Sequence, residues 1–506
     1  FPRCSPAKKI VYFMKIRLLL FPSFFFILSF INCVGVKEKR DNSPNIILIN
    51  VDDLGWTDLS IMGSKYYQTP NIDKLAESGM IFYNAYASAA NCAPSRATML
   101  SGKYNTEHKI YTVGTSERGN KKTRKLIPEK NNEILDLDYF IIPEMLKTKG
   151  YINGHFGKWH LGPEGFYPEQ NGFDINIGGN EHGGPGGYFS PYVNPNIEDG
   201  SDGEYLTDRI GDEVVSFIEK NKRNKFFAYV PFYAVHTPIE SKNEYEKKYL
   251  NIKGDDKHNR SDYAGMIESL DENVGKILTK IDELNLLEHT LIIFTSDNGG
   301  IRHISNQFPL RAGKGSYYEG GIRVPLIFSW KKRIKENSES FERVSNIDFF
   351  PTLIKIVGYE KYLDLDGLDL NPIFENKKLS NRSLFFHFPI YLEPYNVHKD
   401  QARDPLFRTR PGSVIIKGNW KLHNYFEDNK IELYDLNNDL TELTDLSEIN
   451  EEKKDELYHE LLNWRKKNNA PIPSKLNPNY DQFYVDSLNY MVASKKVRGK
   501  VNKNEY

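Results

Sequence analysis

The sequence predicts a large α/β domain followed by a smaller α+β domain. Apolar, strand-like segments alternate with amphipathic helical patterns over most of the chain, and this alternation predicts a large, mostly parallel sheet sandwiched by helices. In the last quarter, short segments separated by turn residues predict an antiparallel sheet followed by a helix. A length of 506 residues can bury the core that such a two-part enzyme needs.

The first predicted strand, Asn45 to Val51, is a continuous β-branched apolar run, which is typical of a strand buried on both faces. Five further segments have the composition of strands: 80–86, 151–156, 226–231, 290–295 and 323–329. Helical patterns lie between and after them, at 71–78, 95–100, 142–149, 206–220, 263–286 and 348–357. The antiparallel segments are 412–417, 420–425 and 431–435, and the helix after them is 451–464.

The amino-terminal region has the pattern of an export signal. Residues 1–13 precede the first methionine, Met14, and we expect them to be upstream sequence and not protein. A cationic stretch then leads into an apolar segment, 18–31, that is too short for a membrane span, so residues 14–33 are predicted to be a signal peptide. The remaining chain is predicted to divide into a catalytic domain, a smaller domain and a tail, with the bounds 44–385, 386–475 and 476–506.

The three cysteines are placed so that no disulfide framework is expected. Cys4 precedes Met14, Cys33 lies at the end of the signal, and Cys92 alone lies within the predicted domains. Cys33 is either a lipidation site or close to an ordinary cleavage site, and the residues before it are larger than lipoprotein signals prefer. We therefore expect an exported protein, in the periplasm or on the outer membrane or cell surface as a lipoprotein, otherwise secreted.

The charge balance excludes one class of partner. Lysine and arginine are interspersed with acids, and the formal net charge is −1. The only basic segment, 495–503, is typical of a solvated terminus. We expect no nucleic-acid binding, and contact with a membrane only through a lipid anchor at Cys33.

One short motif places Cys92 at the start of a helix. Residues 92–102 read CAPSRATMLSG, and Pro94 suits a first helical turn. Free amides and the helix dipole at such a position favour an anionic nucleophile. The alternative is a buried structural thiol.

Acidic residues follow two predicted strands. Asp52 and Asp53 come directly after the first strand, and Asp297 and Asn298 come after the strand that begins at Thr290. Ligands of open α/β sheets bind at the carboxyl ends of strands, and adjacent carboxylates need a cation to neutralise them. Three carboxylates and an amide oxygen suit Ca²⁺ or Mg²⁺. The alternative is that each pair only caps a turn.

Cationic residues form a third set: Lys158, His160, His236 and Lys314. In an extended segment Lys158 and His160 share a face, so both can point at one anion. Each histidine taken alone is more often structural. Residues 313–314 do not form a nucleotide-binding loop, because a glycine follows them where Ser or Thr is required. The glycine-rich segment 178–187 is either an active-site rim or a long surface turn.

These motifs together resemble the type I, formylglycine-dependent sulfatases, an arylsulfatase-like family of the alkaline phosphatase superfamily. In that family the cysteine of the CxPSR motif is oxidised to Cα-formylglycine. The resemblance extends from residue 45 to about residue 358. It includes GKWH at 157–160, HTP at 236–238, SDNG at 296–299, PLRAGK at 309–314 and EGGIRVP at 319–325.

The resemblance implies a role for each matching residue. Asp52, Asp53, Asp297 and Asn298 would hold one divalent metal, usually calcium, together with an oxygen of the matured Cys92. Arg96 would stabilise the hydrated formylglycine, and Lys158 and Lys314 would neutralise the sulfate. His160 would help to expel sulfate, and His236 would protonate the leaving alcohol. A further polar contact in the region 180–188, and any contact from Asn306 or Arg311, stays open.

The implied reaction is hydrolysis of a sulfate ester. This reaction requires a cation and basic side chains to stabilise the charge on the sulfate oxygens, and an acid to protonate the departing oxygen. The residues present can supply these groups. Export and the aromatic segment 186–192 favour a sulfated polysaccharide or oligosaccharide, such as an algal glycan, as substrate. A formylglycine-generating or sulfatase-maturating enzyme is the expected partner. The alternatives are a phosphoester or phosphonate hydrolase of the same superfamily and an inactive glycan-binding relative.

Overall fold

The computed structural model describes residues 43–494 of the chain. The predicted upstream segment, the signal peptide with Cys33 and the basic end of the tail lie outside the described residues. Within residues 43–494, no helix has the combination of length and apolar character that crossing a membrane requires.

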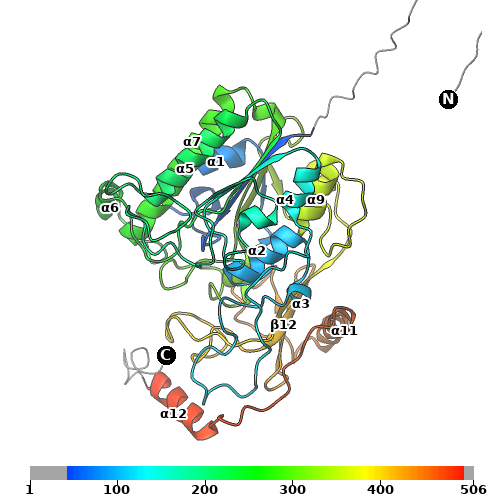
Figure 1. Ribbon diagram of the computed structural model, residues 1–506. Coiled ribbons are helices and arrows are strands. Elements are labelled where there is room, and N and C mark those ends of the chain that lie inside the picture. The colour runs from blue at the N-terminus through cyan, green and yellow to red at the C-terminus, as the bar shows by residue number, and fades with distance from the viewer. Residues whose placement is uncertain (1–42, 495–506) are drawn as a thin grey trace, which may run out of the picture. The chain divides into compact units, whose positions relative to one another are not determined.

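An eight-stranded sheet lies at the centre of the larger part of the molecule, in the order β5-β4-β6-β1-β7-β8-β2-β9 (Figure 1). Its strands run parallel except β8, which is antiparallel to both of its neighbours. The bounds are β1 Asn45–Val51, β2 Met80–Phe82, β4 Ile152–Phe156, β5 Ile175–Ile177, β6 Phe226–Val230, β7 Thr290–Ser296, β8 Leu326–Ser329 and β9 Ser338–Ser340. The predicted mostly parallel sheet is confirmed.

Helices cover both faces of this sheet because its strands are apolar on both sides. In β1, Ile47 and Ile49 pack into the core beneath one helical layer, whereas Ile46 and Leu48 pack into the core beneath the other. The first layer contains α1 Pro70–Glu77, α5 Leu206–Asn221 and α7 Ser261–Glu283. The second contains α2 Cys92–Ser101, α4 Ile142–Thr148 and α9 Phe349–Val357.

A second sheet of four antiparallel strands forms the smaller part, as predicted. Its strands are β11 Ser383–Phe388, β12 Gly412–Lys417, β13 Trp420–Tyr425 and β14 Ile431–Asp435. Helix α11, Glu451–Lys467, packs through Leu457 and Leu461 against one face. The other face packs against the loop before β8, where Tyr317 and Tyr318 lie in one apolar cluster with the strands.

One predicted strand, Met80 to Tyr86, is wrong as a single element. The chain turns at Tyr83 and Asn84, so β2 joins the large sheet while β3, Ala85–Tyr86, pairs with β10, Val344–Ser345. Backbone hydrogen bonding from Tyr83 to Ser340, and a hydrogen bond from the Asn84 side chain to the carbonyl of Phe341, hold the turn. The remaining helices are α3 Asn105–His108, α6 Asn243–Leu250, α8 Glu319–Ile322, α10 Asn371–Phe374 and α12 Gln482–Ala493.

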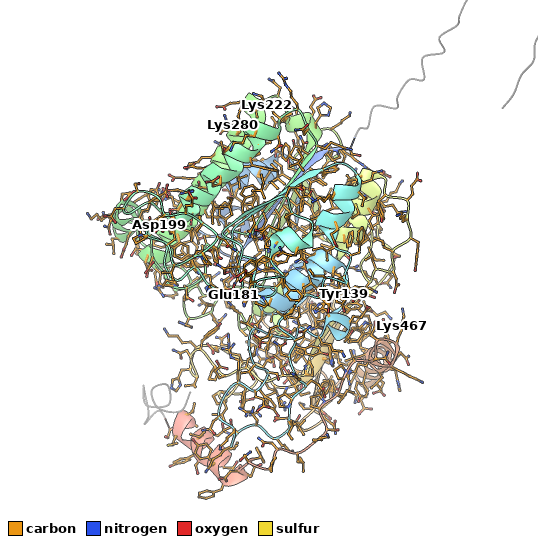
Figure 2. The ribbon with its side chains drawn as sticks, viewed as in Figure 1. Tyr139, Glu181, Asp199, Lys222, Lys280 and Lys467 are labelled. Atoms are coloured by element: carbon orange, nitrogen blue, oxygen red, sulfur yellow. The ribbon has the colours of Figure 1, made fainter. Side chains whose placement is uncertain are left out.

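Exposed charges cover the outer layers. Lys222 and Lys280 lie at the outer side of α5 and α7 (Figure 2), where both are close to Glu219. Such exposed pairs contribute little to stability.

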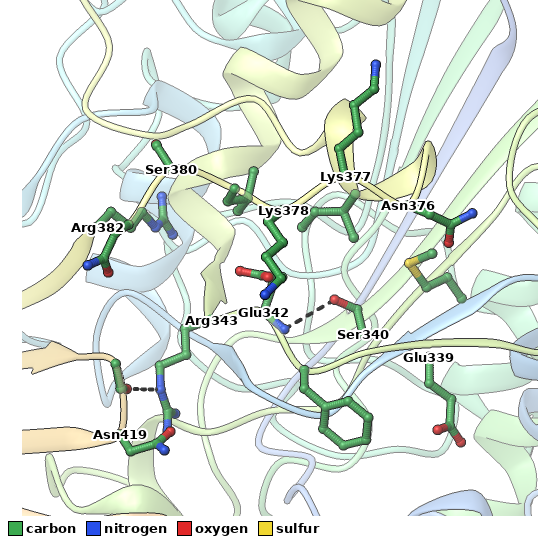
Figure 3. A pocket seen from close by; sticks show the side chains of 16 residues that line it. Glu339, Ser340, Glu342, Arg343, Asn376, Lys377, Lys378, Ser380, Arg382 and Asn419 are labelled. Atoms are coloured by element: carbon green, nitrogen blue, oxygen red, sulfur yellow. Dashed lines mark hydrogen bonds between the residues drawn. The ribbon is translucent and has the colours of Figure 1, made fainter.

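A groove of about 550 Å³ separates the loop before β10 from the segment 376–382 (Figure 3). Arg343, Arg382 and Asn419 lie along it, and Arg343 donates a hydrogen bond across it to the carbonyl of Gly418. No residue predicted to act in the site lines this groove.

The junction of the two parts contains a fully buried charge cluster. Lys421 Nζ in β13 lies 3.0 Å from a carboxylate oxygen of Glu319 in α8 and 2.9 Å from one of Glu442. All three side chains have no exposed surface. Burial, opposed by Lys421, raises the pKa of Glu442 to about 7. Because two acids share one ammonium group, that group holds α8 and the smaller part together.

Removing the lysine should destabilise the protein strongly. In Lys421→Met the buried Glu442 loses its lysine, whereas Glu319 keeps Arg323 at 3.3 Å, and we expect the free energy of unfolding to fall by about 3–5 kcal/mol. The matched control is Lys417→Met on the neighbouring strand, since Lys417 makes partly exposed pairs with Glu456 and Glu460, and should lose about 1 kcal/mol or less. Urea denaturation measures both, and equal losses would contradict the assignment.

Candidate active site

The carboxyl ends of β1 and β7 bring the predicted acidic residues together. Val51 and Ser296 are register partners, so the residues that follow them lie side by side. The side chains of Asp52, Asp53, Asp297 and Asn298 are all buried. One carboxylate oxygen from each aspartate lies within 4.8 Å of the others. The grouping predicted for a metal site is therefore present.

Hydrogen bonds fix this acidic cluster but leave two oxygens without partners. The amide of Asp53 donates to Asp297 Oδ1 at 3.3 Å, and Asn298 Nδ2 donates to Asp53 Oδ1 at 2.8 Å. Asp52 Oδ1 and Asn298 Oδ1 are buried and accept no hydrogen bond. Buried oxygens of this kind are costly unless they bind something. Three carboxylates and one amide oxygen are hard donors of the kind that Ca²⁺ prefers, so these residues fit such an ion.

Three buried cations neutralise the three carboxylates, and each comes from a different element. Arg96 in α2 donates through Nε to Asp297 at 2.8 Å. Lys158 after β4 lies 2.7 Å from Asp52, and Lys314, in the loop before α8, lies 2.7 Å from Asp53. The structure therefore brings all three predicted basic side chains to the acidic cluster.

The pKa values of Asp297 and Asp53 are shifted in opposite directions. Burial raises the pKa of Asp297 to about 6, and the nearby charge of Asp52 adds to the effect. Burial also opposes ionisation of Asp53, but Lys314, His236 and Lys158 hold its pKa well below the usual value. An added cation would favour the ionised form of both.

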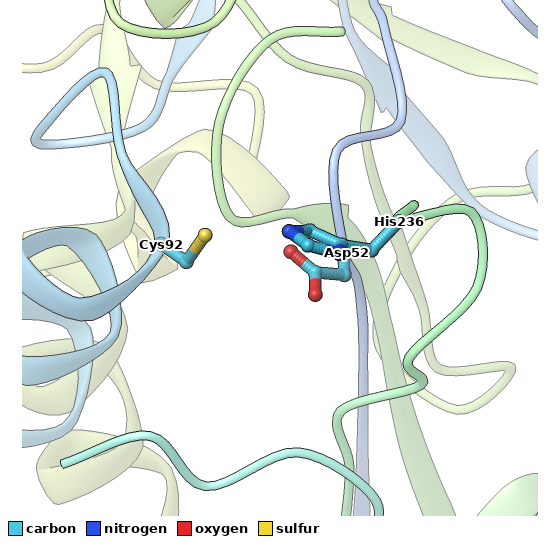
Figure 4. Close-up of side chains that lie close together, drawn as sticks. All are labelled: Asp52, Cys92 and His236. Atoms are coloured by element: carbon cyan, nitrogen blue, oxygen red, sulfur yellow. The ribbon is translucent and has the colours of Figure 1, made fainter. Parts of the chain in front are cut away.

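Cys92 is the first residue of α2, as predicted, and its side chain is buried. Its sulfur faces the Asp52 carboxylate and the His236 ring, and the three ligand atoms lie within 4.8 Å of one another (Figure 4). Burial raises the pKa of the thiol to about 11, although Lys158 and Lys314 oppose the shift. A nucleophilic cysteine needs a lowered pKa, so the unmodified thiol is poorly suited to attack.

Both predicted histidines lie beneath the glycine-rich segment 178–187, which is a rim of the site and not a remote surface turn. A Cβ added to Gly183 would lie 2.6 Å from Cε1 of His160, so only glycine fits there. Gly184 lies against the His236 ring. His236 Nδ1 hydrogen-bonds the carbonyl of Thr237 at 2.7 Å, which leaves Nε2 3.7 Å from Asp53.

The two imidazoles are neutral at pH 7 in the absence of a bound anion. Burial lowers the pKa of His236 to about 3, and the charge of Lys314 adds to the effect. Burial, together with Lys158 and Arg96, lowers the pKa of His160 well below the usual value. An anion placed between these groups would raise both pKa values.

Several residues have structural roles that the sequence left open. Arg311 points away from the site and donates to the carbonyl of Glu442, and the Asn306 side chain accepts from the amide of Phe308. Tyr188 is buried and donates to the carbonyls of Tyr233 and His236.

Most rings of the aromatic segment 186–192 therefore give no support to the expectation of a sugar substrate, which the sequence drew partly from this segment. Tyr188 and Tyr192 are buried, and only Phe189 is exposed. The pattern of glycine and aromatic residues in the sequence does not indicate that the Tyr188 ring supports the backbone at His236.

Calcium should stabilise the folded protein through the acidic cluster. An ion at 100-fold excess over its Kd adds about 2.7 kcal/mol to the free energy of unfolding. We expect Ca²⁺ to raise the Tm of the purified protein and to have little effect on Asp297→Asn. The matched control, Asp212→Asn on the exposed face of α5, should keep the wild-type shift. An equal calcium response in Asp297→Asn would contradict this site.

Comparison with known proteins agrees with the geometry. The model of the family "Sulfatase" matches residues 44–359, and that of "N-sulphoglucosamine sulphohydrolase, C-terminal" matches residues 313–468. A protein named "Sulfatase" from Formosa agariphila is 35% identical, over 86% of this chain and 91% of its own. The N-acetylgalactosamine-6-sulfatase of Canis lupus familiaris is 32% identical over 68% of each chain.

A solved structure shares the whole architecture. The crystal structure of Ps i-CgsB in complex with k-i-k-neocarrahexaose superposes with a TM-score of 0.70 and 29% identity, over 91% of this chain and 100% of that chain. The family match covers more than half of the chain and contains all the clustered acidic, basic and cysteine side chains. The chain therefore belongs to the sulfatase family, and it is a sulfuric ester hydrolase.

Proposed function

We propose that this sulfatase removes sulfate from a sulfated carbohydrate, using formylglycine made from Cys92 and one bound calcium ion. The observation that carries the proposal is the position of Cys92. Its side chain lies at the start of a helix, next to the Asp52 carboxylate and the His236 ring, yet burial keeps its thiol protonated. A maturation enzyme that acts on the chain before folding would reach Cys92, which is buried afterwards.

The modified residue would supply what a thiol lacks. A hydrated aldehyde at position 92 offers one hydroxyl to attack sulfur and a second whose deprotonation releases sulfate. Arg96 donates one hydrogen bond to the carbonyl of Lys158 at 2.9 Å, and its Nη2 is buried without a hydrogen-bond partner, 4.0 Å from Asp52 Oδ1. That nitrogen is available to hold an oxygen on residue 92.

Asp52, Asp53, Asp297 and Asn298 would hold the calcium ion. Bound there, the ion would polarise a sulfate oxygen and favour ionised oxygens nearby. Three carboxylates already face three cations, namely Arg96, Lys158 and Lys314. A divalent ion therefore leaves the site with about two surplus positive charges, which favours an anionic substrate.

The histidines would carry the protons. His236 lies at the open side of the cluster, with 17% of its side chain exposed, and is suited to protonate the departing oxygen. The free imidazole of His236 is neutral. We therefore infer that a bound sulfate group raises the pKa of His236, so that the ring becomes protonated when substrate binds. His160 has its Nδ1 buried without a hydrogen-bond partner, and is suited to accept a proton during sulfate release.

A carbohydrate substrate is supported by the neighbours. One similar structure contains a neocarrahexaose, and the mammalian relatives are named for an amino-sugar sulfate. We also propose that residues 14–33 direct export, with or without lipidation of Cys33. Cell fractionation and mass analysis of the mature amino terminus test this; a cytoplasmic protein that retains residues 14–33 would contradict it.

The decisive test of the function is sulfate release. Protein made with a formylglycine-generating enzyme and calcium should release sulfate from sulfated oligosaccharides, and Cys92→Ala should release none. It should also prefer aryl sulfate to aryl phosphate in kcat/KM. A clear preference for phosphate or phosphonate esters would favour the hydrolase alternative. Binding of glycans without any sulfate release would favour an inactive relative.

The acid role of His236 predicts a leaving-group effect. His236→Ala should lower kcat/KM by about 10²–10⁴-fold on a sugar or alkyl sulfate, where the departing alkoxide needs a proton. The loss should be much smaller on 4-nitrophenyl sulfate, because nitrophenolate leaves without protonation. Steady-state kinetics on both substrates measure the ratio, and equal losses would show that His236 does not act as the acid.

A further inference from the structure

Two arginines beside Lys314 make no ion pair with any carboxylate of the described residues. Arg302 follows the SDNGG segment after β7, and Arg408 comes from the smaller part of the molecule; neither has a carboxylate oxygen within 4.0 Å in residues 43–494. Arg302 Nη1 donates to the carbonyls of Leu310 and Ala312. Burial lowers the pKa of Arg302 to about 10, although the charge of Asp400 opposes the shift.

Arg408 is held rigidly against the sulfate-binding loop. Its side chain is buried, with the residue 4% exposed, and Nη1 donates to the carbonyl of Lys314 at 3.2 Å. Nε donates to the carbonyl of Glu393 at 2.7 Å, and the guanidinium carbon lies 3.4 Å from the centre of the Tyr395 ring. A stacked guanidinium with fixed donors is a pre-organised anion site.

Both arginines line one narrow cavity with Lys314, Tyr395 and Asp400. Its volume is about 10 Å³, which is the room of a single water-sized atom. Asp400 is the only acid there, and its Oδ2 already accepts from the amides of Tyr395 and Asn396. Two guanidinium groups therefore face one occupied carboxylate, so the cavity has a surplus of positive charge.

We propose that Arg302 and Arg408 form a specificity site for a second anionic group of the substrate, a sulfate ester or a carboxylate on the same or the neighbouring sugar. The inference rests on the proposed function. Because Lys314 contacts both the acidic cluster and this cavity, the second group would lie next to the sulfate that is removed. The small volume admits one oxygen of that group, so the sugar ring stays outside.

His303, which is next to Arg302 in the segment after β7, supports the proposed specificity site. Its ring lies 5.9 Å from that of Tyr395, and its Nδ1 is buried without a hydrogen-bond partner. The charged groups that act on it most strongly are Asp400, Lys399, Arg260 and Arg408. A donor or acceptor on a bound sugar would satisfy this nitrogen, which otherwise carries a desolvation cost.

The test compares monosulfated with disulfated galactose and N-acetylgalactosamine, and with disaccharides in which a uronic acid lies next to the sulfated sugar. Matured wild-type enzyme should show a kcat/KM about 10- to 100-fold higher for the preferred doubly anionic substrate. Arg302→Gln should remove most of this preference, and Arg302→Lys should keep part of it. Arg333→Gln, which removes an exposed charge elsewhere, should keep all of it.

Binding separates a failure of this inference from a failure of the proposed function. The Kd values of Cys92→Ala for the same sugars, measured by calorimetry, need no turnover. A preference for the doubly anionic sugars that Arg302→Gln abolishes supports the site even if sulfate release fails. Equal affinity for singly and doubly anionic sugars, or a preference that survives in both Arg302→Gln and Arg408→Gln, would overturn it. Tighter binding of the disulfated sugars would identify the second group as a sulfate ester. Tighter binding of the disaccharides with a uronic acid would identify it as a carboxylate.

Discussion

The structure depends on the neutralisation of three buried carboxylates that lie together. Asp52, Asp53 and Asp297 meet because β1 and β7 are adjacent and in register, and their charges would otherwise repel strongly. Arg96 and Lys158 bring α2 and the end of β4 to this point. The cluster therefore connects segments that are more than 200 residues apart.

The smaller part of the molecule helps to hold the acidic cluster's basic partner Lys314 in place. The loop that contains Lys314 leads into α8, and Glu319 of α8 is held by Lys421 from the antiparallel sheet. Arg408, also from the smaller part, donates directly to the carbonyl of Lys314. The position of Lys314, which contacts Asp53 of the acidic cluster, is thus supported from two sides by elements outside the large sheet.

The sequence predicted much of this and missed the rest for physical reasons. The strand Asn45 to Val51 was predicted with its observed bounds because a fully buried strand is a continuous apolar run. The grouping of the acidic residues could be predicted because they directly follow two strands, whose carboxyl ends meet at one edge of a parallel sheet. The turn at Tyr83 depends on a backbone contact with Ser340, so no local pattern marks it. The buried cluster around Lys421 joins residues about 100 positions apart, and a single sequence carries no signal that pairs them.

Mass spectrometry of the peptide that contains Cys92 tests the account most directly. The protein is made together with a formylglycine-generating enzyme and purified with calcium. A mass about 18 Da below that of the cysteine peptide, or the mass of the corresponding hydrate, is the predicted result, because the chemistry needs an aldehyde-derived nucleophile. An unmodified cysteine in protein that nonetheless releases sulfate at the full rate would contradict the account, since the buried thiol would then itself be the nucleophile.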